Sequence, residues 1–286
     1  MDGPSREDVL KRTEFLDDVV QTLQFKCLQP WIHLEQGSGS WNMIADNEHT
    51  LGASEVASAA GVIGAYHSRP ALWRIKKGLQ KQEVNVMMHY GIETEIIAIK
   101  QLIRQLTGEE VEGRQEMFGQ FCLFAWNPGR WICEDDQRYR CSPDGIFFDE
   151  LGSLDLLWQD VVQRANKDLS QLPPPRNSWL IEIKCPFSGL PYDVPKSNHL
   201  AQILMQMHIT KIHRCLYVVY TPNHDLKVHA YVVLYDKGVW QQLKARADDF
   251  LRMVQQNIVP PRLGSKWHIP LQCYEVEDFP RSESEK

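Results

Sequence analysis

The second half of the chain alternates strand-like and helical segments, and this order restricts the fold more than any other feature. Its apolar patterns predict the order strand, helix, strand, strand, helix over residues 179–184, 196–210, 214–221, 227–235 and 237–257. Short strands interleaved with helices of this length are typical of an α/β domain. We therefore expect a short mixed sheet with helices packed outside it.

The first half begins with helical patterns and then changes to short strand-like runs. Helices are expected from Ser54 to Gly61, over 70–79 and over Val86–Leu106. The last of these is the clearest, because its apolar side chains recur along one stripe: Ile92, Ile96, Ile99, Ile103 and Leu106. The strand-like runs that follow cover about 111–115, 120–126, 130–133, 139–141 and 145–149.

These patterns divide the chain into three parts. Residues 1–46 form an N-terminal helical extension or lobe, 47–258 one α/β domain, and 259–286 a tail that we expect to be poorly ordered at its end. A polar segment at about 151–178 interrupts the domain, and composition does not decide whether it is a surface elaboration, a flap that contacts the substrate or a partner site.

Composition excludes several classes of protein. The chain has 286 residues, a net charge of −6 and a pI near 5.9, which argue against a nucleic-acid binder that works by bulk positive charge. An enzyme with a local basic channel is still allowed. The seven cysteines are scattered and form no CxxC pair, so we expect neither a zinc ribbon nor a disulfide scaffold. Without a membrane-spanning run or a signal peptide, the sequence predicts a soluble intracellular protein of the cytoplasm or nucleus.

An acid and a base share one face of the strand at 179–184. Glu182 and Lys184 lie at i and i+2, so both side chains project to the same side. Taken alone, such a pair is best explained as an ion pair on a solvated face. Asp144 lies just before another predicted strand, however, and two carboxylates brought together by adjacent strands suit Mg²⁺. A lysine beside them can orient a water molecule or offset charge on a phosphate.

A third carboxylate is available on the long helix. Glu95 lies along the stripe that should face the core, between Ile92 and Ile99. A carboxylate there destabilises the fold unless it is paired or binds a metal. Periodicity alone allows equally that it borders the stripe and points outward or meets an arginine, and Glu93 competes for the same role.

Asp144, Glu182 and Lys184 fit the PD-(D/E)XK nuclease pattern, and the wider context is more specific. The segments Cys141–Gly145 and Leu180–Phe187, together with Gln202 on the following helix, resemble the lambda-type exonuclease (viral recombinase) family. Leu51–Ala57 and Gly91–Glu95 resemble it too, and the family places a glutamate four residues after the glycine, which favours Glu95 over Glu93. The resemblance covers about 47–236 and implies a restriction-endonuclease-like fold, with a central mixed sheet flanked by helices.

The resemblance also implies roles for particular residues. Glu95, Asp144, Glu182 and the carbonyl of Ile183 would hold one or two Mg²⁺, for which Mn²⁺ would substitute. Lys184 would contact the attacking water, and Gln202 would hold that water or the scissile phosphate. Gln206 lies one turn later and would assist, although an ordinary polar helix face explains it better.

DNA contacts are implied by a second group of residues. Ser54 and Ser142 match the hydroxyl donors of the family's 5′-phosphate pocket, and Ser54 is also placed at a helix N-terminus. The densest basic cluster could grip the DNA backbone or form a solvated helix face, and these are equally good explanations; it includes Arg69, Arg74, Lys76 and Lys77.

The chain departs from the family pattern at three places. Asn47 and Leu190 stand where the family tends to carry arginines, so polarity and 5′-phosphate dependence are less determined than the chemistry. Asp144 and Glu182 are 38 residues apart, whereas the phage relative joins these strands by a tight hairpin. Only Cys273 lies near the C-terminus, so we expect no iron–sulfur cluster.

The sequence therefore predicts a Mg²⁺-dependent deoxyribonuclease, in particular a processive 5′→3′ exonuclease acting on linear double-stranded DNA ends in recombination or end processing. A single-strand annealing protein as partner and a ring-shaped homotrimer are implied by the resemblance. Two alternatives stay open: an endonuclease of the same superfamily, and a nuclease-like DNA-binding module that recruits a recombination partner without cutting.

Overall fold

The computed structural model describes most of the predicted α/β domain. It covers residues 48–81, 86–107, 123–126, 130–148, 154–165, 178–223, 228–263 and 266–276. The predicted N-terminal helical extension, the predicted strand at 111–115 and the end of the tail lie outside these residues. None of the described helices combines the length and the apolar character needed to cross a lipid bilayer.

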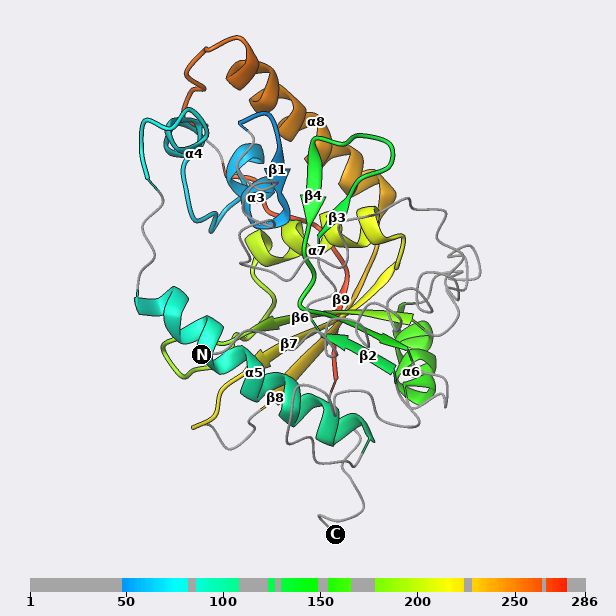
Figure 1. Cartoon of the computed structure of the whole chain (residues 1–286). Helices are drawn as coiled ribbons and strands as arrows, with labels where there is room; N and C mark the ends of the chain where they lie inside the picture. The colour runs from blue at the N-terminus through cyan, green and yellow to red at the C-terminus, as the bar shows by residue number, and fades with distance from the viewer. Residues whose placement is uncertain are drawn as a thin grey trace, which may run out of the picture.

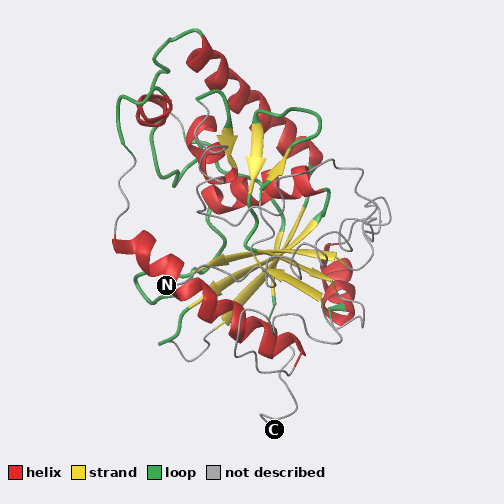
Figure 2. Ribbon diagram, in the orientation of Figure 1, coloured by secondary structure: helices red, strands yellow, loops and turns green. Residues whose placement is uncertain are grey.

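A six-stranded mixed sheet forms the centre of the molecule (Figure 2). Among its described strands only β6 and β7 pair in parallel, and the other neighbours are antiparallel. The parallel pair is possible because helix α7, Ser197–Thr210, connects the two strands. In spatial order the strands are β2 Leu123–Trp126, β5 Gly145–Phe148, β6 Ser178–Lys184, β7 Arg214–Tyr220, β8 Val228–Leu234 and β9 Cys273–Glu275.

Helices cover both faces of this sheet (Figure 1). On one face lie α3, Ala53–Ala60, with α7 and α8, Lys237–Gln255, and beyond them α4, Arg69–Lys76. On the other face lie α5, Val86–Thr107, and α6, Asp155–Ala165. A small sheet packs beside α3 and α7; its strands are β1 Leu51–Gly52, β4 Tyr139–Cys141 and β3 Trp131–Ile132.

The hydrophobic core consists of two clusters, one on each side of the large sheet. Successive side chains of a strand point to opposite faces. Leu180 accordingly joins the cluster under α3, α7 and α8, whereas Ile181 and Ile183 join the cluster under α5 and α6. The central strands are buried on both faces, which explains why their sequences are apolar almost throughout.

Most predicted elements are confirmed, with ends that shift by a few residues. Gly61 ends α3 as expected and adopts the left-handed conformation, with φ of 71°, that glycine tolerates without strain. The described strands between residues 123 and 148 all fall within predicted runs. The strands β1 and β9 were not predicted, and the second of these belongs to the tail.

Two predictions are wrong in detail. The apolar stripe of α5 faces the core only in the helix's second half, since Ile99 is fully buried but Ile92 is 67% exposed. The segment at 151–178 is not simply polar, because it contains α6, through which Leu154 and Val161 reach the core.

Candidate active site

Glu182 and Lys184 project from the same face of β6, as their spacing predicts. The Glu182 side chain is fully buried, and its Oε1 contacts the ammonium nitrogen of Lys184. The lysine side chain is 20% exposed, so solvent or substrate can reach this end of the pair. The pair therefore lies in the protein interior rather than on a solvated face, and only its lysine end is accessible to solvent.

Two amides from α7 also donate hydrogen bonds to Glu182. Gln202 Nε2 donates to Glu182 Oε1 at 2.6 Å, and Gln206 Nε2 donates to Oε2 at 2.8 Å. The two glutamines are four residues apart, so they lie one turn apart on the same helix face. Gln206 is fully buried, and its interpretation as part of an ordinary polar helix face is therefore wrong.

Asp144 joins this group from the start of β5. Its Oδ2 accepts a hydrogen bond of 2.7 Å from the backbone nitrogen of Ile183 on β6, which fixes the carboxylate beside the strand that carries Glu182. The pKa of Asp144 is well above its ordinary value, first because burial disfavours the charge, and then because the carboxylates of Glu182 and Glu95 repel it. The three carboxylates are thus close enough to interact.

Glu95 approaches from α5, on the opposite side of the sheet. Besides acting on Asp144, it contributes to raising the pKa of Cys185 to about 12, an effect that is due first to burial of the thiol. Glu95 is partly buried, whereas Glu93 is exposed. The geometry therefore brings Glu95, and not Glu93, to Asp144.

The donor set fits a hard divalent cation. Three carboxylates gather around a single strand, and the repulsion that raises the pKa of Asp144 is an unfavourable interaction that a divalent cation would relieve. Carboxylate and backbone carbonyl oxygens are the ligands that Mg²⁺ and Mn²⁺ prefer. These residues are therefore suited to hold such an ion.

Lys184 stays charged in this site. Burial, the largest single effect, would lower its pKa, but the carboxylates of Glu182 and Asp144 together outweigh burial and raise it. Burial and the neighbouring lysines Lys184 and Lys196 instead lower the pKa of His199, so that its ring is neutral.

The sequence did not predict this histidine and its tyrosines. His199 Nδ1 lies 2.8 Å from the hydroxyl of Tyr217, and its Nε2 lies 3.4 Å from the hydroxyl of Tyr66. The signal that could have found His199 is its position three residues before Gln202, on the same face of α7. Tyr217 is the residue of β7 that pairs with Glu182.

The residues predicted to contact DNA are not all brought together. Ser54 is exposed in the first turn of α3, and Ser142 is partly buried two residues before Asp144. The basic cluster lies on and just after α4, which packs against α3 and α8 away from the large sheet (Figure 1).

Most of the cluster's charges are paired within the chain. Arg69 is buried and donates to Asp249 of α8 at 2.8 Å. Lys76 and Lys77 form ion pairs at 2.7 and 3.1 Å with glutamates near α3 and β1, namely Glu55 and Glu48. Arg74 is exposed. Of these four basic side chains, the exposed Arg74 is therefore the one most accessible to an anionic partner from solution.

The comparison with protein families tests the resemblance directly. Residues 43–213, more than half of the chain, match the family described as the YqaJ-like viral recombinase domain. The chain belongs to this family. The membership confirms the family inferred from the motifs, and the match contains all the residues of the YqaJ-like site described above, apart from Tyr217. No curated protein sequence matches the chain.

Solved structures support the YqaJ-like fold. An alkaline exonuclease from Laribacter hongkongensis, LHK-Exo, matches with a TM-score of 0.50 and 19% identity over 77% of this chain and 94% of that one, and so does its complex with dAMP. A phage-related exonuclease from Haemophilus somnus 129PT matches with a TM-score of 0.45 and 12% identity over 75% and 97% of the two chains. At this identity the likeness to LHK-Exo shows the fold alone.

Proposed function

We propose that this protein is a divalent-metal-dependent deoxyribonuclease that digests linear double-stranded DNA from its ends. The observation that carries the proposal is the buried Glu182, tied to Lys184 and two glutamine amides and lying beside Asp144. Membership of the YqaJ-like family supports it. The nuclease domain would extend over residues 47–258, and the insertion at about 151–178 would contain α6.

The residues would divide the chemistry among them. A bound Mg²⁺ or Mn²⁺ would supply Lewis acidity at the phosphodiester and at a coordinated water. Glu95, Asp144, Glu182 and the Ile183 carbonyl would hold the ion. Lys184, charged and partly exposed, would contact the attacking water and offset charge on the phosphate.

The position of Gln202 supports a role in orienting Glu182. Its amide nitrogen donates to that carboxylate, which leaves the amide oxygen free to accept a hydrogen bond from the water.

Ser54 and Ser142 would bind the 5′-phosphate, and Arg74 would contact the DNA backbone. Removal of nucleotides from the 5′ end would be processive and would leave a 3′ single strand for a single-strand annealing partner, with a homotrimer around the duplex. We propose that the protein acts on this substrate inside a cell.

The test uses linear duplex DNA labelled separately at the 5′ and 3′ ends, with and without Mg²⁺. We expect early release of the 5′ label as mononucleotide, with no digestion in EDTA. Lys184→Ala and Asp144→Asn should abolish digestion, whereas Lys237→Ala, on the exposed first turn of α8, should leave it unchanged. Full activity in EDTA or in Lys184→Ala would contradict the proposal.

A covalently closed circular duplex separates the related possibilities. Cutting of the circle would show an endonuclease of the same superfamily. Tight binding of linear DNA without release of either label would show a binding module, although Asp144 and Glu182 are both retained here.

A further inference from the structure

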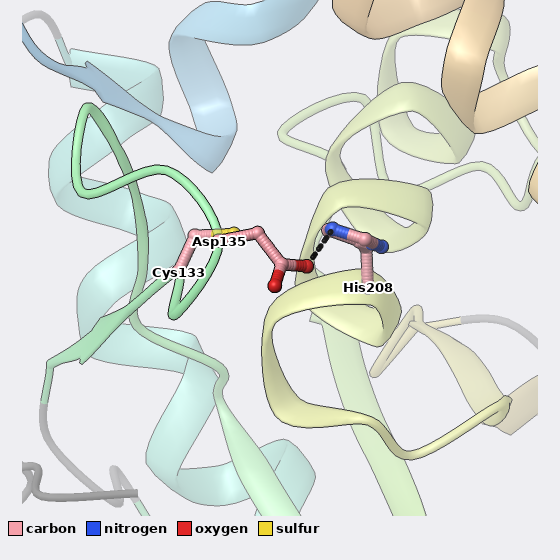
Figure 3. A group of neighbouring side chains, drawn as sticks. All are labelled: Cys133, Asp135 and His208. Carbon is pink, nitrogen blue, oxygen red and sulfur yellow. Dashed lines mark ion pairs between the residues drawn. The ribbon is translucent and has the colours of Figure 1, made fainter.

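A second cluster of ligating side chains lies away from the nuclease carboxylates. Cys133 and Asp135 lie on the turn between β3 and β4, and His208 lies on the last turn of α7 (Figure 3). One ligand atom from each, a thiol sulfur, a carboxylate oxygen and a ring nitrogen, lies within 4.8 Å of the other two. Cys133 is buried, His208 is partly buried and Asp135 is exposed, so the cluster opens to solvent on the carboxylate side.

The histidine ring is held in the orientation that a ligand needs. Its Nε2 lies 3.9 Å from Asp135 Oδ2, while its Nδ1 lies 3.0 Å from the hydroxyl of Tyr235. The ring also stacks on Trp240, with 4.4 Å between centroids. Ligating histidines commonly have their second ring nitrogen fixed by a polar group in this way.

The charge of the cluster also favours a cation. Lys211, just after α7, places its Nζ 3.5 Å from Asp135 Oδ2, so the carboxylate already has a cation beside it. The side chain of Lys211 is 37% exposed. Once the Cys133 thiol is deprotonated, the thiolate and the carboxylate carry two negative charges, which match a divalent ion.

We propose that Cys133, Asp135 and His208 bind one zinc-type transition-metal ion, separate from the nuclease centre. Tetrahedral Zn²⁺ holds S, N and O ligands at about 2.0–2.3 Å, which corresponds to separations of about 3.3–3.6 Å between ligand atoms. His208 Nε2 and Asp135 Oδ2 are 3.9 Å apart, a few tenths of an ångström beyond this range, and all three ligand atoms lie within 4.8 Å of one another. Rotation of the exposed Asp135 side chain would bring its carboxylate closer to the other two ligands. A thiolate and an imidazole select zinc-type ions over Mg²⁺. Binding forms an S–metal bond and releases the thiol proton to solvent. Three protein ligands leave the fourth position for water.

This ion would join the β3–β4 turn to the end of α7. The cluster shares no residue with the proposed nuclease site, whose metal ligands would all be oxygen atoms. The proposal therefore does not depend on the proposed function, and the two can fail separately.

Co²⁺ is the probe, because a Co²⁺–thiolate bond gives a near-ultraviolet charge-transfer absorption that an all-oxygen site does not. The full chain, stripped of metal with a chelator, is titrated with Co²⁺. We expect this absorption to saturate at one ion per chain, with Zn²⁺ abolishing it and a large excess of Mg²⁺ leaving it in place. Asp144→Asn should keep it, which separates this site from the nuclease centre.

Matched variants assign the ligands. Cys133→Ser should lose the absorption, and His208→Gln and Asp135→Asn should weaken Co²⁺ binding at least tenfold. Cys273→Ser and His213→Gln should bind as the wild type does, since His213 also stacks on Tyr235 but is not part of the cluster.

Two results would overturn the proposal. One is the absence of the charge-transfer absorption in the wild type, and the other is its persistence in Cys133→Ser. If Cys133→Ser does not fold, as judged by circular dichroism, Asp135→Asn decides the outcome, because the exposed Asp135 can be changed without disturbing the core. Unchanged affinity in that variant would then refute the site.

Discussion

Replacing Gln206 by methionine should separate the stability of the protein from its activity. The change removes a 2.8 Å hydrogen bond to the buried carboxylate of Glu182, and a hydrogen bond to a charged group contributes about 1.5–3 kcal/mol. It also removes Gln206 Oε1, which is buried without a hydrogen-bond partner among the described residues and costs about 1–3 kcal/mol. Methionine has a similar volume. The two effects offset each other in part, so the free energy of unfolding should fall by no more than about 2 kcal/mol.

Activity should respond much more strongly to this change. Glu182 would lose one of the two amides that orient it, and loss of such a partner typically lowers metal affinity or activity about 10- to 100-fold. Urea unfolding measures the first effect, and the initial rate on linear duplex DNA over a range of Mg²⁺ concentrations measures the second.

The matched control for this variant is Gln242→Met, at an exposed position of α8. It should change neither the stability nor the rate. If Gln206→Met lowers the free energy of unfolding by more than about 3 kcal/mol, the buried Oε1 of Gln206 does not destabilise the wild type as argued. An unchanged rate with unchanged Mg²⁺ dependence would refute the orienting role.

Three further predictions concern other parts of the fold. Asp249→Asn should destabilise the protein by about 1–3 kcal/mol in urea unfolding, because it leaves the buried Arg69 without its carboxylate. The hydrogen bond from Arg69 lowers the pKa of Asp249, so the wild type should lose this stabilisation as the pH falls below about 4, the ordinary pKa of an aspartate. The Asp249→Asn variant should not show that loss. Equal acid sensitivity of the two proteins would contradict the prediction. Ile99→Ala should lower the free energy of unfolding by about 2–5 kcal/mol, whereas Ile92→Ala should lower it by less than about 0.5 kcal/mol. Similar shifts of the melting temperature in the two variants would refute the conclusion that only the second half of α5 faces the core. Arg74→Ala should reduce the slope of log affinity against log salt for duplex DNA by about 1, measured by fluorescence anisotropy, and an unchanged slope would exclude a phosphate contact.

The part of the candidate active site that follows strand geometry could be predicted from the sequence. Glu182 and Lys184 lie on one face because the side-chain period of a strand is two, and their apolar neighbours showed that the strand is buried. The motif context added Asp144 and selected Glu95 over Glu93. Both selections agree with the charges that act on Asp144 in the folded chain.

Features that depend on how elements cross could not be predicted in the same way. The stripe of α5 is continuous in the sequence, but only the second half of the helix packs into the core, so Ile99 is covered and Ile92 is not. Gln206 is polar on a helix, and only the position of α7 over β6 shows that its face is internal. Cys133 and His208 are far apart in the sequence, so no spacing pattern could connect them. The pairing of β9 with β8 likewise depends on the tail returning to the edge of the sheet.

The register between β5 and β6 has a consequence for how this lineage can vary. Phe148 pairs with Ser178, so the long connection between these strands starts and finishes at neighbouring positions of one ladder. Doubling the length of a flexible connection costs only about 0.6 kcal/mol in closure entropy, and the ladder fixes Asp144 against Ile183 whatever lies between. Evolution or an engineer can therefore insert sequence here without moving the strand that carries Glu182. The limit is set by α6, because its Trp158 packs edge-on against Trp179, and deletion of the helix would remove this aromatic contact from the core.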